Sequence, residues 1–480
     1  MPRPRRHLAD GEATRRGIAA IERQFDVPAT FPPAVEAAAL AAVRSWSGPP
    51  REPRPPGASA LADRLDLPLI AVDPAGSTDL DQAFHIERSG DGHVVWYAIA
   101  DVAAFVAAGD AVDVEARVRG TTVYLPGRRA PLHPPSLSEG AASLLAGQVR
   151  PSLLWRFDLD SAGAVRRADV RRSLVRVREA LSYDEAQRRV DAGDAGSLGL
   201  LREVGEARIA AEVERGGISL ELPEQDVTAT RQGYLLSYRQ AFAVERWNAQ
   251  LSLLTGMTAA GWFVEAGVGP LRTLPDPPPG FVESMAMSAS ALGVPWRGSY
   301  SEALRALDPS RPADAALMSE AARGLRGAGY RLAGSGPPGE MRHAAVASHY
   351  THATAPLRRL IDRFAGEVAV AIAAGRAVPG WVLDGLDGVV DTMGRANRRA
   401  AQVDNAVVDL IEALLLSASG RSDFRGVVVA VGSDGRGRVQ LADPPVLARV
   451  EGATTVGVEV DLRLELADPE SRDVRFSVAR

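Results

Sequence analysis

The apolar pattern of this 480-residue chain changes along its length, and these changes constrain its fold more than any other feature. Residues 1–60 have helix-forming composition, and β-prone segments begin at about residue 62. The middle of the chain is mainly helical, and the last sixty residues are β-prone again. Strands and helices in separate runs, rather than in strict alternation, predict an α+β chain of several domains. We therefore expect three units, at 1–60, 61–420 and 421–480.

The N-terminal patterns predict two helices and a break. We expect helices over 13–25 and 34–46, with Thr30 as the N-cap of the second. Prolines and glycines from Gly48 to Gly57 predict a linker, because successive prolines block both a helix and a central strand. Beyond this linker, the β-prone runs expected to form strands or hairpins are 67–72, 92–100, 121–125, 155–160 and 164–175.

The remaining chain predicts more helices and then a small barrel. Ser182 and Glu185 have the spacing of a capping box for a helix that starts at Tyr183. The last sixty residues carry short β-prone segments separated by Gly, Asp and Pro, which is typical of an OB-type barrel. The further segments expected to be helical are 198–215, 236–260, 314–326, 356–374 and 387–418. The segments expected to form barrel strands are 424–431, 437–442, 448–451 and 458–466.

Composition excludes several kinds of chemistry. All 55 basic residues are arginine, and the chain has neither lysine nor cysteine. Lysine-dependent P-loops, Schiff-base lysines, cysteine nucleophiles, thiolate metal sites and disulfides are therefore excluded. Every fixed cation is a guanidinium, which suits bidentate binding of carboxylate or phosphate. The net charge of −5 argues against a non-specific cationic coat for nucleic acid, but it is compatible with a local basic channel.

Targeting signals are not evident in the sequence. The N-terminal residues lack the apolar region of a signal peptide, and no apolar run is long enough to span a membrane. We therefore expect a cytoplasmic protein with no membrane partner, and we expect it to be a monomer.

The sharpest local feature is an acidic cluster. Asp73, Asp79 and Asp81 follow the apolar run 67–72 at spacings of six and two residues. On an extended segment the last two point to the same side, and a turn at 74–76 would bring the first beside them. Such a cluster is either an exposed acidic turn or a site for a hard divalent cation such as Mg²⁺. Two such ions can flank a phosphodiester during its hydrolysis.

Several motifs occur in order after this cluster, and together they resemble the ribonuclease II (RNB) family. The resemblance covers about 62–420, and the expected C-terminal barrel is similar to the S1-type OB domain of that family. The motifs are AVD…STDLD at 71–81, YAIADV at 97–102, EARVRGTTVYLP at 115–126, PLHP at 131–134, LS at 137–138, SL at 143–144, QVRP at 148–151 and YTHATAPLRR at 350–359.

The resemblance implies a 3′→5′ exoribonuclease. Members of the family thread single-stranded RNA into a channel and hydrolyse it processively to 5′-mononucleotides by a two-metal-ion mechanism. By motif matching, Asp73, Asp79 and Asp81 hold Mg²⁺ or Mn²⁺, and Asp81 is indispensable. Gln82 stands where the family has a fourth aspartate. Its amide oxygen can coordinate a hard cation, but without the charge.

Other matched residues are expected to touch RNA. Arg358 lies at the position that contacts the scissile phosphate, where a guanidinium can brace developing negative charge. The competing interpretation is a structural arginine paired with Asp362. The resemblance also assigns RNA contacts to Thr354 and Arg359 of the same motif.

Tyr124 matches an aromatic residue that stacks on the terminal nucleotide, and its alternative is a core tyrosine. Asp404 is expected to replace a family glutamate near the site, where it would position water or hold Arg358, unless it lies on a solvated helix face. His133, His349 and His352 are expected to be structural, although His133 is also a candidate for the channel wall.

The chain also departs from the family pattern. Ala353 and Ala355 replace an aromatic and a hydroxyl residue, and Leu360 replaces a tyrosine. Residues 1–60 are too few and too helical for the usual cold-shock barrels, which leaves a helix-turn-helix or winged-helix unit or a docking segment. An RNA-binding or regulatory protein that has lost catalysis is the alternative function. A DNA-binding regulator would not explain the acidic cluster.

Overall fold

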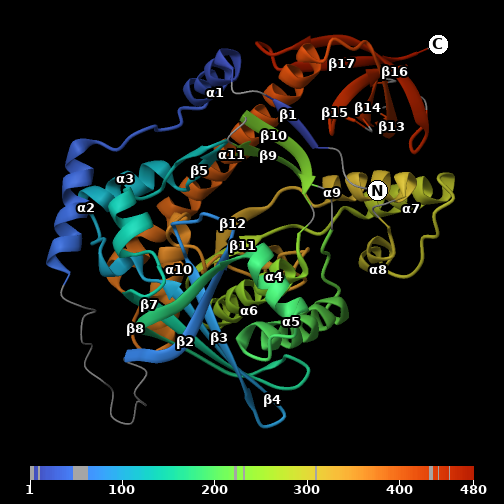
Figure 1. Ribbon diagram of the computed structural model, residues 1–480. Coiled ribbons are helices and arrows are strands. Elements are labelled where there is room, and N and C mark those ends of the chain that lie inside the picture. Colours follow the sequence, from blue (N-terminus) through green and yellow to red (C-terminus); the bar gives the residue numbers. More distant parts are fainter. Residues whose placement is uncertain are drawn as a thin grey trace.

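The computed structural model describes residues 5–8, 11–46, 63–220, 224–230, 233–239, 241–308, 311–431, 436–441, 443–452 and 455–479. The fold is α+β with a C-terminal five-stranded barrel, as expected (Figure 1). The expected linker at 48–57 lies outside the described residues.

The helices of the described chain are α1 (Glu12–Gln24), α2 (Pro33–Ser45), α3 (Ala111–Arg119), α4 (Tyr183–Asp191), α5 (Ser197–Glu214), α6 (Ala243–Ala266), α7 (Pro279–Ala291), α8 (Tyr300–Arg305), α9 (Pro312–Gly324), α10 (Leu360–Ala373) and α11 (Gly380–Ala418), with short turns η1 (Val102–Ala104), η2 (Leu137–Ala141) and η3 (Pro338–Met341). The strands are β1 (Arg5–Leu8), β2 (Asp63–Asp73), β3 (Gln82–Ser89), β4 (Gly92–Ala100), β5 (Val123–Leu125), β6 (Arg128–Ala130), β7 (Val149–Leu159), β8 (Val165–Ser182), β9 (Glu224–Thr230), β10 (Gly233–Arg239), β11 (Pro270–Thr273), β12 (Gly329–Leu332), β13 (Asp423–Val431), β14 (Arg436–Leu441), β15 (Leu447–Glu451), β16 (Glu459–Asp468) and β17 (Asp473–Val478).

The first group of strands closes into a barrel in the order β2-β3-β4-β7-β8. Its centre is the antiparallel pairing of β4 with β7, where Tyr97 faces Trp155 and Trp96 faces Arg156. Tyr97 and Trp155 enter one core with α5, α6 and α10, whereas Trp96 enters another with α2. Both faces of β4 are therefore buried, which explains why the sequence of this strand is almost continuously apolar. The sequence predicted strands at β2, β4, β7 and β8, but neither β3 nor the closure of the barrel.

The longest helix, α11, connects the two halves of the fold (Figure 1). Its first half, including Val389 and Met393, packs into the core around the first barrel. Its second half, including Leu410, packs against the C-terminal barrel β13-β14-β15-β17-β16. Glu412 adds a polar tie by accepting a hydrogen bond from the Leu447 backbone N–H at 2.9 Å.

The N-terminal helices do not share one core. Ile18 and Ile21 of α1 pack with the second half of α11, whereas Val35 and Ala39 of α2 pack with the first barrel. This arrangement agrees with a docking segment better than with a helix-turn-helix unit. Thr30 is not an N-cap: Pro32 occupies that position without a side-chain hydrogen bond.

The predicted helix at 236–260 is partly wrong. Helix α6 begins at Ala243, and residues 233–239 form β10, the middle strand of the sheet β1-β10-β9. The pairing of Arg6 with Leu236 joins the N-terminus to this strand. A partner so distant in sequence overrides local helix propensity.

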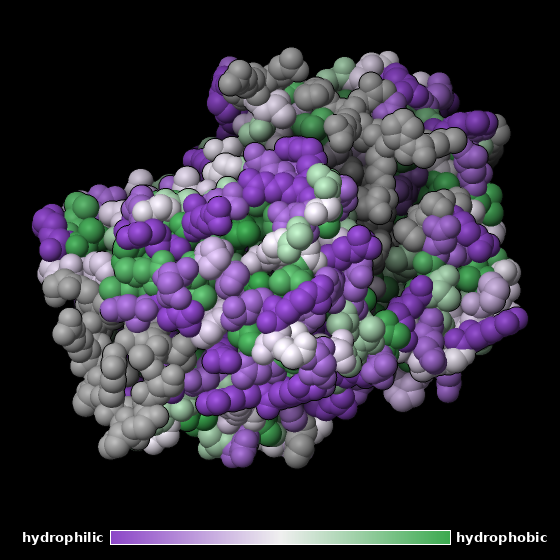
Figure 2. All heavy atoms as spheres, turned by 60° about the horizontal axis from the view of Figure 1, so that its bottom comes forward, coloured by the Kyte–Doolittle hydropathy of each residue, from purple (hydrophilic) through white to green (hydrophobic). Residues whose placement is uncertain are grey.

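The face of the molecule in Figure 2 carries hydrophilic and apolar side chains in a mixed distribution. Hydrophilic side chains cover most of it, with apolar ones scattered between them (Figure 2). Among the described residues, no helix combines the length and the apolar character needed to cross a membrane.

Candidate active site

Two strand ends bring the outer members of the acidic cluster together. Strands β2 and β3 are antiparallel, with Ile70 opposite Phe84. Continued by three residues, this register sets the backbone of Asp73, the last residue of β2, opposite that of Asp81, which directly precedes β3. Burial, together with the charges of both carboxylates, raises the pKa of Tyr97. Gly76 makes the intervening turn with φ of +82°, and the Ser77 N–H donates to the Pro74 carbonyl at 3.1 Å. The turn predicted at 74–76 is confirmed, but strand pairing also determines where Asp73 lies.

The loop between these strands is held by one buried serine. The Ser143 hydroxyl donates to the Thr78 carbonyl at 2.8 Å and accepts from the Leu80 N–H at 2.9 Å. The Leu144 N–H donates to the Leu80 carbonyl at 3.0 Å. Ser143 is fully buried, so these bonds are shielded from water and fix the backbone that carries the aspartates.

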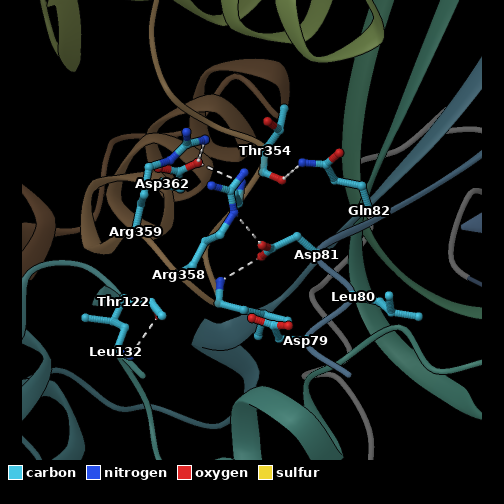
Figure 3. Close-up of polar contacts among 12 residues, drawn as sticks. Asp79, Leu80, Asp81, Gln82, Thr122, Leu132, Thr354, Arg358, Arg359 and Asp362 are labelled. Carbon is cyan, nitrogen blue, oxygen red and sulfur yellow. Dashed lines mark hydrogen bonds and ion pairs between the residues drawn. The ribbon is translucent and has the colours of Figure 1, made fainter. Parts of the chain in front are cut away.

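Asp81 joins the two motifs that lie far apart in the sequence. The backbone N–H of Leu357 donates to Asp81 Oδ1 at 2.8 Å, and Arg358 Nε lies 3.4 Å from Asp81 Oδ2 (Figure 3). Asp81 is buried, and burial raises its pKa to about 8 despite the lowering effects of Arg358 and the Leu357 N–H. Asp81 is thus a buried carboxylate with one nearby guanidinium and one backbone donor.

The charge of Arg358 acts on Asp73 as well as on Asp81. Burial raises the pKa of Asp73 to about 7, Arg358 opposes this rise, and Asp79 adds to it. Asp73 and Asp81 therefore share the guanidinium of Arg358, and the charge of Arg359 also opposes the rise that burial causes in the pKa of Asp81. This donor chemistry fits a hard divalent cation, because such ions bind carboxylate oxygens and neutralise closely spaced negative charge.

Asp79 has a cationic partner that the sequence analysis missed. Arg129 Nη1 lies 2.5 Å from Asp79 Oδ1, while Arg129 Nη2 donates to Thr78 Oγ1 at 2.6 Å. Arg129 also pairs with Glu139 at 2.9 Å. Within the described residues, no three histidine, aspartate or glutamate side chains gather closely enough to form a metal site.

The two consecutive arginines have different partners. Arg358 points toward Asp81, whereas Arg359 forms a bidentate pair with Asp362, with nitrogen–oxygen distances of 2.9 and 2.8 Å (Figure 3). Asp362 Oδ1 also accepts from the Ala355 N–H at 2.7 Å. The structural pairing considered for Arg358 thus belongs to Arg359, and the partly exposed Arg358 remains available to a ligand.

Gln82 and Thr354 are linked to each other. Gln82 Nε2 donates to the Thr354 backbone carbonyl at 2.6 Å, and the Tyr97 hydroxyl donates to Gln82 Oε1 at 2.8 Å. The Tyr97 hydroxyl also lies 2.9 Å from Ser252 Oγ. These bonds fix the orientation of the Gln82 amide. Thr354 is buried, so its backbone helps to order the site.

Tyr124 is not a core residue. It lies on β5 between buried Val123 and Leu125, and its own side chain is 47% exposed. The register places it opposite Arg129 of β6, on the same face of the hairpin. Burial of its hydroxyl and the charge of Asp79 raise the pKa of Tyr124. An exposed ring therefore lies beside the acidic cluster. The two-residue loop at 126–127 was the sequence signal that could have identified this hairpin and its arginine.

The remaining candidates lie outside this constellation. Asp404 is an exposed residue of α11, and the Asp81 carboxylate, rather than Asp404, lies beside Arg358. His352 Nδ1 lies 2.8 Å from the Tyr330 hydroxyl, which agrees with a structural role. His133 is buried, and burial lowers its pKa to about 3. It is therefore a neutral residue of the interior.

Comparison with known proteins gives two family matches. Residues 62–366 match the model of the RNB domain, and residues 422–479 match the RNase II-type exonuclease C-terminal S1 domain. Ribonuclease R of Escherichia coli strain K12 is 28% identical over 377 residues, which cover 74% of this chain and 44% of that protein. The chain spans between 35% and 60% of the length of the first curated relatives that it matches.

Solved structures share the fold. Apo RNase R of Mycoplasma genitalium superposes with a TM-score of 0.86 at 19% identity, over 98% of this chain and 78% of that one. Structures of that protein with ribose methylated single-stranded RNA and with double-stranded RNA match with TM-scores of 0.86 and 0.84. Yeast Ssd1, described as a pseudonuclease, matches with a TM-score of 0.68 at 16% identity, over 82% of this chain and 50% of that one.

Proposed function

Because this chain belongs to the RNB family, we propose that it is a hydrolytic exoribonuclease that degrades single-stranded RNA processively from the 3′ end to 5′-mononucleotides. We further propose that 61–420 forms the catalytic unit, that 421–480 forms an RNA-binding barrel and that 1–60 is a helical segment docked on both.

The observation that carries the proposal is the contact between two distant motifs. Leu357 and Asp81 are 276 residues apart in sequence, yet the backbone of the first hydrogen-bonds the carboxylate of the second. The same contact brings Arg358 beside Asp81. An acidic cluster and a partly exposed guanidinium then share one site, which is the charge pattern that hydrolysis of a phosphodiester requires.

Each residue has a distinct role in the proposed reaction. Asp73, Asp79 and Asp81 would hold Mg²⁺ or Mn²⁺ once Asp79 leaves Arg129, and the ion would supply charge that stabilises the attacking and leaving oxygens. Arg358 braces the non-bridging oxygens as negative charge develops on them. Tyr124 stacks on a terminal base and keeps it beside the site without reading its sequence.

The C-terminal barrel carries a ladder of arginines that suits a phosphate backbone. Arg438 of β14 pairs in register with Arg449 of β15, which pairs in register with Arg475 of β17. All three side chains are exposed, and directly opposed like charges destabilise a sheet. Arg475 already pairs with Asp473 at 2.9 Å, so an anionic ligand would act mainly on the repulsion between Arg438 and Arg449. RNA bound along the ladder would also tether the substrate between catalytic cycles.

The decisive experiment is hydrolysis of labelled poly(A) in Mg²⁺ or Mn²⁺. Wild-type protein should release 5′-mononucleotides, whereas Asp81→Asn should release none and still bind the RNA. Asp66→Asn is a matched control, because Asp66 is an exposed aspartate that pairs with Arg64 away from the site. Equal mononucleotide release by the wild type and Asp81→Asn would refute the proposed site.

A second candidate function is RNA binding without hydrolysis. Gln82 replaces one carboxylate of the family pattern, and its amide is engaged by Tyr97 and Thr354. The fold is also that of yeast Ssd1, described as a pseudonuclease. Retention of Asp73, Asp79 and Asp81 favours the nuclease. RNA binding without mononucleotide release in either metal would favour the second function.

A further inference from the structure

Arg129 links Asp79 to residues outside the acidic cluster. One amino group of its guanidinium contacts Asp79 at 2.5 Å, and the other contacts Thr78 Oγ1 and Glu139 Oε1 at 2.6 and 2.9 Å. Arg129 Nε also donates to Glu139 at 3.2 Å. The side chain is only 22% exposed, so its contacts are partly protected from water. Arg129 thus contacts Glu139 through two nitrogens and Asp79 through one, and hydrogen bonds between charged groups are shorter and stronger than those between neutral ones.

The charges around the site are unequal. Four carboxylates, of Asp73, Asp79, Asp81 and Glu139, face the two guanidinium groups of Arg129 and Arg358. When all four are ionised, the excess of two negative charges equals the charge of one divalent cation, whereas burial of Asp73 and Asp81 opposes their ionisation until a cation binds. The two arginines are also placed differently, because Arg358 is 3.4 Å from Asp81, whereas Arg129 is bound tightly to Asp79.

We propose that Arg129 is an internal counter-cation for Asp79, so that the site binds one divalent cation tightly through Asp73 and Asp81 and a second one weakly. The second ion must displace the guanidinium from Asp79 before it can use that carboxylate. This inference rests on the proposed function, which assigns Asp79 to the metal set. It makes Arg129 a positioning residue that sets the affinity of the second ion.

The hairpin that carries Arg129 supports this role. Arg129 and Tyr124 are cross-strand neighbours on β6 and β5, and the adjacent Arg128 forms an ion pair with Glu22 of α1. The hairpin is therefore anchored on the N-terminal helix while its inner face reaches the site. Arg129 can therefore leave Asp79 by a change of its side-chain rotamer, while the anchored backbone of the hairpin stays in place.

The test is a titration of the protein with Mn²⁺ alone, in which electron paramagnetic resonance measures the concentration of unbound Mn²⁺. Wild-type protein should show one tight and one weak site. In Arg129→Met, which has no charge, the weak site should tighten about tenfold or more, with the tight site within twofold of wild type. Arg129→Lys keeps the charge and should stay near wild type. Arg425→Met is the matched control and should change neither dissociation constant, because Arg425 pairs with Asp461 in the C-terminal barrel.

A second variant tests the same inference if Arg129→Met does not fold. Asp79→Asn should abolish the weak site and retain the tight one. The proposal is overturned if Asp79→Asn loses the tight site, or if a folded Arg129→Met leaves the weak site unchanged or removes it. The RNA assay is separate: ion binding that responds to Arg129 in a protein that releases no mononucleotide would refute the nuclease but not the counter-cation.

Discussion

The backbone N–H of Leu357 donates to the carboxylate of Asp81 at 2.8 Å, and this bond orients a side chain that is otherwise surrounded by the protein interior. Because the donor belongs to the backbone, substitution of the Leu357 side chain does not remove it. The adjacent Arg358 is therefore brought to the same carboxylate by the chain itself, and its chemistry can be tested separately from the position of Asp81.

Arg358 should act on the chemical step. We expect Arg358→Ala to lower the rate of mononucleotide release about 100-fold, because removal of one donor to developing charge has effects of this order. Arg358→Lys should remain slow, because a lysine ammonium cannot form the planar fork. Single-turnover release from labelled poly(A) measures the effect, and the dissociation constant for RNA should change little.

Arg359 is the matched control for this prediction. Arg359→Ala leaves the buried Asp362 without its partner, which typically costs about 3–5 kcal/mol of unfolding free energy. Urea denaturation should therefore distinguish the two arginines, with the larger loss of stability in Arg359→Ala. A loss of stability in Arg358→Ala as large as that in Arg359→Ala would contradict a catalytic role.

Tyr124 should grip the RNA end through its ring. Tyr124→Ala should weaken RNA binding by about 1–3 kcal/mol, the usual value of one base stacked on an aromatic side chain. Tyr124→Phe should bind like wild type, because the hydroxyl is not required for stacking. Fluorescence anisotropy with a short labelled oligonucleotide measures this. Phe242→Ala, which removes another exposed aromatic ring, should have no effect.

Asp113 should make stability depend on pH. Burial favours its neutral form, but the Gly109 N–H, Arg363 and Arg117 outweigh burial and lower its pKa. A lowered folded-state pKa contributes stability that is present above the unfolded value of about 4 and is lost as pH falls through the folded value. The difference in unfolding free energy between wild type and Asp113→Asn should be greatest at neutral pH. It should shrink below about pH 4, as measured by urea denaturation at several pH values. A difference that stays constant from pH 7 to pH 3 would contradict this assignment.

The arginine ladder should bind RNA through charge. Arg449 is its central member, in register with Arg438 on one side and Arg475 on the other. Arg449→Ala should weaken binding to all RNA sequences alike and reduce the slope of log affinity against log salt by about 0.7. Arg425→Ala is the control, because Arg425 is already paired with Asp461 at 3.0 Å. An unchanged salt slope in Arg449→Ala would exclude the ladder from the RNA path.

Sequence patterns predicted the elements whose cause is local. The continuous apolar run 92–100 coincides with β4, and the capping box of Ser182 with Glu185 is present as expected. Residues 233–239 could not be assigned in this way, because their strand depends on pairing with the N-terminus. Thr30 was also misread: its carbonyl accepts from Arg119 at 2.5 Å, a contact invisible in the local pattern.

The candidate site shows the same division. The resemblance of its motifs to the RNB family placed Asp73, Asp81 and Arg358 in one expected site. The partners of Asp79 and Gln82 could not be read, because each comes from a different part of the fold. Arg129 reaches Asp79 only through the β5–β6 hairpin. A local motif thus identifies which charged residues form the site, whereas the residues that neutralise them are known only from the tertiary structure.

The single helix α11 packs into both hydrophobic cores. Its length between these cores therefore fixes how far the C-terminal barrel is rotated about the helix axis relative to the first barrel. An α-helix turns by about 100° and advances by about 1.5 Å with each residue. One residue inserted between Met393 and Val403 would hardly lengthen the molecule, but it would rotate the C-terminal barrel by more than a quarter turn about the helix axis. Evolution can therefore lengthen or shorten this helix by whole pairs of turns, about seven residues at a time, and still direct the barrel toward the same site.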